Sequence, residues 1–225
     1  MSMPFYVPPE QMMKDRADYA RKGIARGRAL VGLRYVDGIA LVAENPSETL
    51  RKISEIYDRI AFAGVGKYNE FDQLRVAGVR AADLKGFQFS RDDVDARSLA
   101  NEYARFLGQT FTHEMKPMEV EILVAEVGED ATDDQMFHIL YDGTMFDQRD
   151  HAAIGGDSER INEALAASFS AALDRDDAIR AGVEALSAEH QLGPDDLEVA
   201  VLCRGSARRC FQRLSVADLT VILNA

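Results

Sequence analysis

A short hairpin ends in charged side chains that could bind a reacting group. Residues 28–45 form two apolar strands around a Val-Asp-Gly turn, and the glycine supplies the positive φ that a tight turn needs. Glu44 lies at the end of the second strand, and Lys52 follows soon after it. A nucleophile at the head of the first strand would need a hydroxyl or thiol, but the residue there is Arg28. From the residues alone, Glu44 and Lys52 are expected to be solvated charges at strand ends, without a nucleophile to serve.

N-terminal nucleophile chemistry also needs a free α-amine beside the hydroxyl. Removal of Met1 would expose Ser2 as such a group. Ser2 lies far upstream of the hairpin, however, with a proline pair and a predicted helix between them. No Gly-Thr processing site precedes the hairpin either, so we expect no catalytic residue in this chain.

Metal, phosphate and redox chemistry find little support in the sequence. The histidines have no metal-ligand spacing and the aspartates near residue 92 lack the glycine and glutamate of a calcium loop, so no metal or cofactor is expected. Gly64-Val65-Gly66-Lys67 lacks the spacing of a phosphate loop, which favours strand-end packing. Cys203 and Cys210 could face each other across a hairpin, but so sparse a pair favours reduced thiols.

Composition and charge narrow the possible partners. The chain has 225 residues, enough for one large domain, and a formal net charge of -12, which argues against generic nucleic-acid binding. The basic stretch 21–28 is expected to form ion pairs with a neighbouring acidic surface. No apolar run approaches the ~18 residues of a membrane span. The first ten residues lack the features of a secretory signal, which predicts a cytoplasmic location and no membrane partner.

Strand pairs alternate with helix pairs along the chain. Proline in the first turn predicts a helix over residues 9–26, and a capping box at Ser90 predicts one that ends at Pro117. Further helices are expected over residues 67–85, 161–173 and 179–186 and at the C-terminal end. Strands beyond the hairpin are expected over residues 53–56, 60–66, 120–124, 137–142, 197–203 and 210–214, and the acidic loop 129–134 is expected to be solvated. This order indicates antiparallel sheets with helices outside them, an α+β fold.

Together these elements resemble the α subunit of a proteasome core particle of the actinobacterial type, a non-catalytic member of the N-terminal-nucleophile hydrolase superfamily. The resemblance covers essentially the whole chain, and it is carried by PEQMMKDRADYARKGIARG, VAENPS, LRKISEIYDRI and AGVGKYNEFDQLR. It implies a four-layer α-β-β-α sandwich, with two antiparallel sheets between layers of helices. It also implies an N-terminal gate segment, residues 1–8, and a single domain, residues 9–225, whose first helix covers residues 9–26.

The resemblance implies a function without catalysis by this chain. Heptameric rings of neighbouring α subunits would cap rings of proteasome β subunits, control substrate entry and dock an AAA ATPase activator through its C-terminal tail. The assembly would be a threonine-type endopeptidase that degrades proteins with ATP, Pup-tagged proteins among them. Catalytic members begin the first strand with threonine and carry an aspartate and a lysine where this chain has Glu44 and Lys52. Arg28 stands at the threonine position, so these two residues have no nucleophile to serve.

In α subunits of the family, the lysine at the position of Lys52 is the cationic wall of a pocket between neighbouring subunits. That pocket receives the C-terminal carboxylate of the activator, and a partly shielded ion pair of this kind is screened less than one in open water. By the same resemblance, Gly27 and Gly66 line the pocket through close backbone approach, and Asp18 orients its edge.

The resemblance also assigns a gate to the N-terminal segment. Seven copies of its apolar residues would gather at the pore axis, and the proline pair would act as a stiff hinge to the first helix. The gate residues would be Met1, Ser2, Met3, Pro4, Phe5, Tyr6, Val7, Pro8 and Pro9. The Tyr-Asp-Arg gate motif of archaeal and eukaryotic α subunits is absent, although Asp18-Tyr19-Ala20-Arg21 resembles their Glu-Tyr-Ala-Arg segment. A closed gate is therefore expected to use other contacts.

Two other functions stay open from the residues alone. One is a self-processing N-terminal-nucleophile hydrolase, which would expose a threonine or serine at the head of the strand. The other is a monomeric ligand-binding α+β protein. Intact-mass measurement addresses the first alternative, and native mass spectrometry addresses the second.

Overall fold

The computed structural model describes residues 8–187, 190–205 and 209–224, and its strands form two antiparallel five-stranded sheets. The first sheet contains, in spatial order, β10 (Phe211–Arg213), β9 (Leu197–Cys203), β2 (Gly38–Glu44), β1 (Leu30–Tyr35) and β8 (His151–Ile154). The second contains β3 (Ile53–Tyr57), β4 (Ile60–Gly66), β5 (Val120–Glu126), β6 (Gln135–Ile139) and β7 (Met145–Gln148). The hairpin predicted over residues 28–45 is confirmed as β1 and β2, with Tyr35 opposite Gly38 at its turn.

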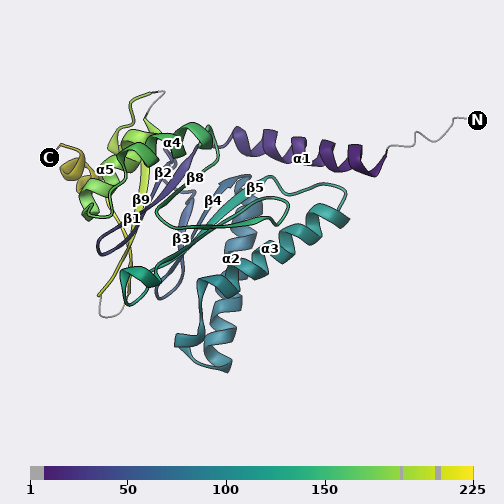
Figure 1. Cartoon of the computed structure of the whole chain (residues 1–225), viewed down its shortest axis with the longest axis horizontal. Coiled ribbons are helices and arrows are strands. Elements are labelled where there is room, and N and C mark those ends of the chain that lie inside the picture. Colours follow the sequence, from purple (N-terminus) through teal and green to yellow (C-terminus); the bar gives the residue numbers. More distant parts are fainter. Residues whose placement is uncertain (1–7, 188–189, 206–208, 225) are drawn as a thin grey trace, which may run out of the picture.

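Helices cover the outer face of each sheet (Figure 1). The first sheet is covered by α4 (Ser158–Ser168), α5 (Arg175–Leu186) and α6 (Val216–Asn224), and the second by α2 (Tyr68–Gln88) and α3 (Ala96–His113). The remaining helix, α1 (Pro9–Ala25), extends from one end of the sandwich (Figure 1). The predicted four-layer α-β-β-α architecture is therefore confirmed.

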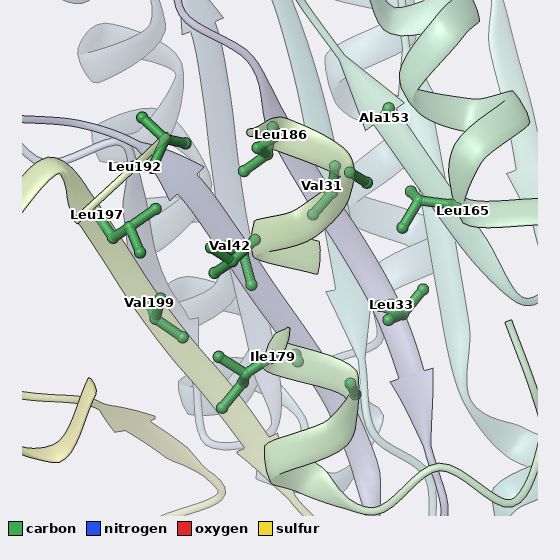
Figure 2. Packing of buried hydrophobic residues seen from close by; sticks show 14 of the residues in the cluster. Val31, Leu33, Val42, Ala153, Leu165, Ile179, Leu186, Leu192, Leu197 and Val199 are labelled. Carbon is green, nitrogen blue, oxygen red and sulfur yellow. The ribbon is translucent and has the colours of Figure 1, made fainter. Parts of the chain in front are cut away.

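The alternation of side chains along each strand builds the layers. On β1, Val31 and Leu33 pack against the helices of the first sheet, as Figure 2 shows, whereas Leu30 packs between the two sheets. Because both faces of β1 and β2 are covered, these strands are apolar except for Arg34 and Glu44, and they are almost wholly buried. Two core layers thus hold β1 and β2 in place, and the site residues lie at the ends of these strands.

Two predicted helix boundaries are wrong. Ser90 caps only a single turn, Arg91–Asp93, and α3 begins after Asp95, whose carboxylate accepts a hydrogen bond from the Ser98 amide at 2.7 Å. A Ser and an Asp close together both satisfy the capping rule, and the sequence does not rank them. The α3 helix also ends at His113, before the proline that was expected to stop it.

The segment after residue 142 differs most from its prediction. The short strands β7 and β8 were not predicted, because four-residue strands with polar residues such as Asp147 give little periodic signal. The helix predicted over residues 161–173 ends at Ser168. Its predicted members Phe169 and Leu173 still pack against the core, but from the loop that leads to α5.

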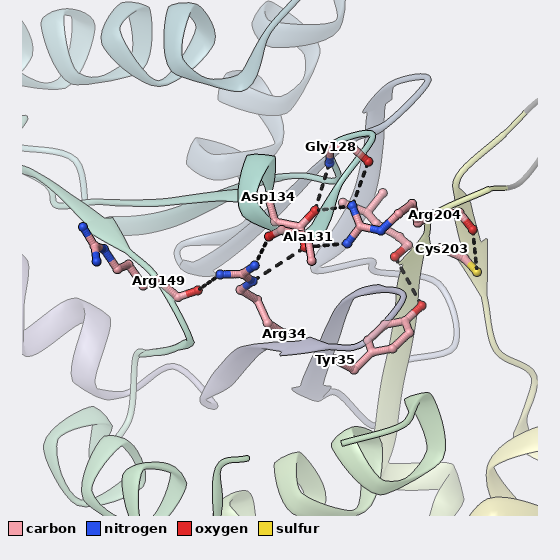
Figure 3. A network of polar contacts seen from close by, with 9 residues as sticks. Arg34, Tyr35, Gly128, Ala131, Asp134, Arg149, Cys203 and Arg204 are labelled. Atoms are coloured by element: carbon pink, nitrogen blue, oxygen red, sulfur yellow. Dashed lines mark hydrogen bonds and ion pairs between the residues drawn. The ribbon is translucent and has the colours of Figure 1, made fainter. Parts of the chain in front are cut away.

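The acidic loop 129–134 is not uniformly solvated, which corrects a second expectation. The Asp134 side chain has no exposed surface and lies between Arg34 of β1 and Arg204, which follows β9 (Figure 3). Arg204 donates to both carboxylate oxygens, at 3.0 and 2.9 Å, and the Gly128 amide donates to one of them at 2.9 Å. Asp134 therefore ties the second sheet to two strands of the first.

Neither a disulfide bond nor a membrane-spanning helix is found among the described residues. Cys203 and Cys210 lie opposite each other across the β9–β10 hairpin, where the Cys203 amide donates to the Cys210 carbonyl at 2.9 Å, and both are free thiols. Among residues 8–187, 190–205 and 209–224, none of the helices has the length and apolar character needed to span a membrane.

Candidate functional site

Lys52 lies at the entrance to β3, beside the start of the first strand. Its ammonium donates a hydrogen bond to the backbone carbonyl of Arg28 at 2.6 Å. Its own carbonyl accepts from the Gly64 amide at 3.0 Å, which fixes the backbone to β4. Only this one donor of the ammonium is used within the described chain, and two N–H groups remain for an anion.

The surroundings of Lys52 lower its affinity for a proton. Burial lowers the pKa of its ammonium to about 8, and the carboxylates of Glu44 and Glu198 oppose that shift. The guanidinium of Arg28 lowers the pKa further, because two like charges lie close together. An ion pair between the partly buried Lys52 ammonium and a bound carboxylate is stronger than one made by a fully solvated lysine, since water screens the pair less.

A buried carboxylate holds the Lys52 segment in place. Glu198 of β9 accepts hydrogen bonds from the backbone amides of Lys52 at 2.8 Å and Ile53 at 3.2 Å. It also accepts from the Asn45 amide group at 2.7 Å and forms an ion pair with Arg213. The side chain is almost completely buried, so water contributes little to its solvation. Glu198 thereby fastens the approach to β3, in the second sheet, to β9 in the first.

Sequence reasoning missed Glu198 and the asparagine that assists it. Asn45 turns the chain after β2: its side chain donates to the Leu50 carbonyl at 2.8 Å and accepts from the Ser47 amide at 3.2 Å. One signal was available for Glu198, which is the single charged residue in the apolar strand Leu197–Cys203. A carboxylate inside such a strand must find partners, because burying it alone is costly.

The head of the first strand is occupied by an ion pair. The Arg28 guanidinium donates to Glu44 Oε1 at 2.7 Å, and His190 Nε2 lies 3.4 Å from the same oxygen. The Glu44 amide donates to the Ala29 carbonyl at 3.1 Å, so the two strand ends are joined by backbone as well. Arg28, Glu44 and Lys52 are thus brought together, and the position where a nucleophile would stand carries a cation.

Gly27 and Gly66 meet next to this cluster. A Cβ on Gly27 would lie 2.9 Å from a Val65 methyl group and 3.1 Å from the Gly66 amide nitrogen. Gly66 has a φ of +106°, and a Cβ there would lie 2.0 Å from the Glu119 carbonyl oxygen. Neither position has room for a side chain, so the backbone at Gly27, which precedes Arg28 in the chain, packs closely against the backbone at Gly66.

The other predicted site residues lie apart from Lys52 or outside the described structure. Asp18 is on α1, where it pairs with Arg21 at 3.4 Å, and no contact within the described residues joins it to Lys52. Of the predicted gate, Met1, Ser2, Met3, Pro4, Phe5, Tyr6 and Val7 lie outside the described residues. Pro8 precedes α1 and its carbonyl accepts from the Met12 amide at 3.1 Å, and Pro9 is the first residue of the helix.

No metal centre is formed by the part of the chain that the structure describes. Within it, no group of three or more histidine, cysteine, aspartate or glutamate residues is arranged to hold an ion. The residues at the strand heads are suited to ionic binding: Lys52 and Arg28 can bind a carboxylate, and Glu44 can compete for both cations.

Comparison with known proteins agrees with this fold. The family model described as proteasome subunit matches residues 24–202. A protein of Acidimicrobium ferrooxidans named proteasome subunit alpha is 62% identical over 97% of this chain and 95% of its own length. Proteins of the same name from Kineococcus radiotolerans and Thermomonospora curvata are 55% and 54% identical, each over 99% of this chain and 98% of its own length. The chain therefore belongs to the proteasome subunit family, among the α subunits.

Proposed function

We propose that this chain is a non-catalytic α subunit that gates a cytoplasmic proteasome core and docks its ATPase activator. The observation that carries the proposal is Arg28 at the head of the first strand, joined in an ion pair to Glu44. The residue follows α1 in the chain and has neither a free α-amine nor a hydroxyl, so it cannot act as a threonine-type nucleophile. Peptide cleavage then falls to proteasome β subunits, on which heptameric α rings stack.

The docking site is Lys52 with the backbone wall of Gly27 and Gly66. The activator is an AAA ATPase whose C-terminal carboxylate binds the Lys52 ammonium, and Asp18 of α1 orients the edge of the pocket. A tail that binds the open arrangement of the ring more tightly than the closed one shifts the population toward the open state. Substrates delivered this way include Pup-tagged proteins, as expected for a core of this type.

Assembly and labelling test this function. Co-expressed with its β subunit, the chain is expected to form a stacked four-ring particle with seven α subunits in each outer ring, as measured by native mass spectrometry. A threonine-directed covalent inhibitor should then label β and leave the intact mass of α unchanged. Labelled α would favour the self-processing hydrolase, and a lone 24.9 kDa species in the presence of β would favour the monomeric binding protein.

Docking should weaken as the pH rises. The Lys52 pKa is about 8 in the free chain, and a bound carboxylate raises it because the ion pair favours the ammonium, so docking takes up a proton. Affinity is therefore expected to be constant below about pH 7 and to fall through pH 8, by up to about tenfold per unit.

This pH dependence can be measured by the fluorescence anisotropy of a labelled decapeptide that copies the end of the partner ATPase. The titration runs between about pH 7 and about pH 9.5 on the assembled particle. The Lys52→Met variant is the control, because it lacks the titrating group and should show no fall. A wild-type affinity that stays level across pH 8 would contradict this role of the ammonium.

Removal of residues 2–7 should speed entry of small peptides. If these residues plug the axial pore, their deletion removes a steric barrier without touching the β active sites, so fluorogenic peptides are cleaved several-fold faster by the assembled particle. Replacing Met3, Phe5 and Tyr6 by serine keeps the length and should give a similar increase if apolar packing closes the gate. Hydrolysis at the wild-type rate in both variants would count against a plug.

A further inference from the structure

The ion pair beside Lys52 is unevenly shielded. The Arg28 side chain is 50% exposed and the Glu44 side chain only 12%, although their atoms lie 2.7 Å apart. The carboxylate is thus held within the fold while the guanidinium reaches toward solvent. Within the described residues only one nitrogen of the guanidinium has an acceptor, so the other N–H groups can receive a ligand.

Arg28 and Lys52 also share one location. The Lys52 ammonium donates to the carbonyl of Arg28, and the Arg28 guanidinium is close enough to lower the Lys52 pKa. A carboxylate that enters the site consequently meets two cations, one compact and one forked. Each carboxylate oxygen can accept from a different cation, which fixes the orientation of the group as well as its position.

We propose that Arg28 is a second cation of the carboxylate pocket and that Glu44 is its resident competitor, displaced from Arg28 when a tail carboxylate docks. This proposal rests on the proposed docking function and adds a regulatory exchange to it. In the free subunit Glu44 neutralises Arg28, and in the docked subunit the terminal carboxylate of the activator takes the place of Glu44.

The surroundings allow this exchange without leaving a buried charge alone. His190 Nε2 lies 3.4 Å from Glu44 Oε1 and is itself more than half exposed, so Glu44 keeps a polar neighbour when Arg28 turns away. Glu198, the other carboxylate near Lys52, is bound to two backbone amides, Asn45 and Arg213, and is not available for exchange. Glu44 is therefore the acidic group that sets the threshold for docking.

The test uses the assembled particle and two fluorescein-labelled decapeptides that copy the end of the partner ATPase. One peptide ends in a free carboxylate and the other in a carboxamide. Arg28→Ala should weaken binding of the acid peptide about tenfold, equivalent to about 1.4 kcal/mol. Glu44→Gln should strengthen it about fivefold, because it removes the competing charge. Both variants should change binding of the amide peptide by less than about twofold.

Neighbouring residues provide matched controls. Arg51→Ala and Glu48→Gln change the same charges at exposed positions of the segment that joins β2 to β3, and neither should alter the preference for the acid peptide. Arg28→Lys keeps a cation and should recover most of the preference for the acid peptide, because the expected effect follows the charge. Thermal unfolding of each variant identifies any general loss of folding.

The outcomes separate this proposal from the docking function beneath it. If the wild type prefers the acid peptide and Lys52→Met removes that preference, docking at Lys52 stands. An unchanged preference in both Arg28→Ala and Glu44→Gln would then overturn the exchange alone. If the wild type does not distinguish the two peptides, the docking function itself fails. Weaker binding of the acid peptide to Glu44→Gln would also overturn the exchange, because removal of a competing carboxylate should not weaken binding.

Discussion

Replacing Lys52 by methionine should reduce ATPase-driven protein degradation by at least about tenfold, because a charge-assisted hydrogen bond contributes about 1.5–3 kcal/mol. Methionine keeps an apolar stem of similar length, so the substitution removes the ammonium and little else. The ammonium's one hydrogen bond within the described chain is to the Arg28 carbonyl, at the margin of the site, and its loss should cost little stability. In the proposed heptameric ring, seven equivalent pockets would multiply the effect on binding of a multivalent activator.

The informative comparison is between protein degradation and peptide hydrolysis. Degradation of a folded substrate with ATP should fall, while cleavage of a small fluorogenic peptide by the β subunits should stay at the wild-type rate. Arg51→Ala is the matched control, since it removes a neighbouring exposed cation and should leave both rates unchanged. A parallel fall in both activities would assign Lys52 a structural role.

Asp134→Ala should lower the free energy of unfolding by about 3–5 kcal/mol, the usual cost of removing one partner from a buried ion pair. Arg34 and Arg204 would both lose their shared carboxylate, and the Gly128 amide would lose its acceptor (Figure 3). The pKa of Arg204 is raised chiefly by its hydrogen bonds to Asp134, which favour the charged guanidinium. Two partly buried cations would then remain without the carboxylate that they share.

Urea denaturation of the purified chain, followed by circular dichroism, measures this loss. Asp134→Asn keeps an acceptor for the Gly128 amide and should fall between the wild type and the alanine variant, since only the charge is gone. Glu129→Ala, an exposed change in the same loop, should stay within about 0.5 kcal/mol of the wild type. An alanine variant as stable as Glu129→Ala would show that the network contributes nothing net.

The fold was predictable largely because most strands and helices are marked by a pattern of neighbouring residues in the sequence. Apolar strands, turn glycines and the proline at the start of α1 are properties of neighbouring residues, and these elements were located correctly. The elements that were not predicted lack such a pattern. The strands β7 and β8 are four residues long and pair with β6 and β1, which lie at other places in the sequence, so a local pattern does not reveal them.

The candidate site was predictable only in its first residues. Lys52, Gly27 and Gly66 were identified through the resemblance. In the structure the Lys52 ammonium binds the Arg28 carbonyl, and Gly27, the residue before Arg28, packs against Gly66. Glu198 was missed because its partners at Lys52 and Ile53 are nearly 150 residues away, and its distances to them depend on how the two sheets stack. Asp134 was misjudged for the same reason, since an acidic loop alone does not reveal two arginines on another sheet.

The carboxylate of Glu198 has a mechanical consequence. This carboxylate, on β9 of the first sheet, accepts a hydrogen bond from the Lys52 amide, and the Lys52 carbonyl accepts one from Gly64 of β4 in the second sheet. The Lys52 segment is therefore hydrogen-bonded to both sheets, and it is not a loose loop. A force applied to a ligand bound at Lys52 would therefore act on the two sheets together.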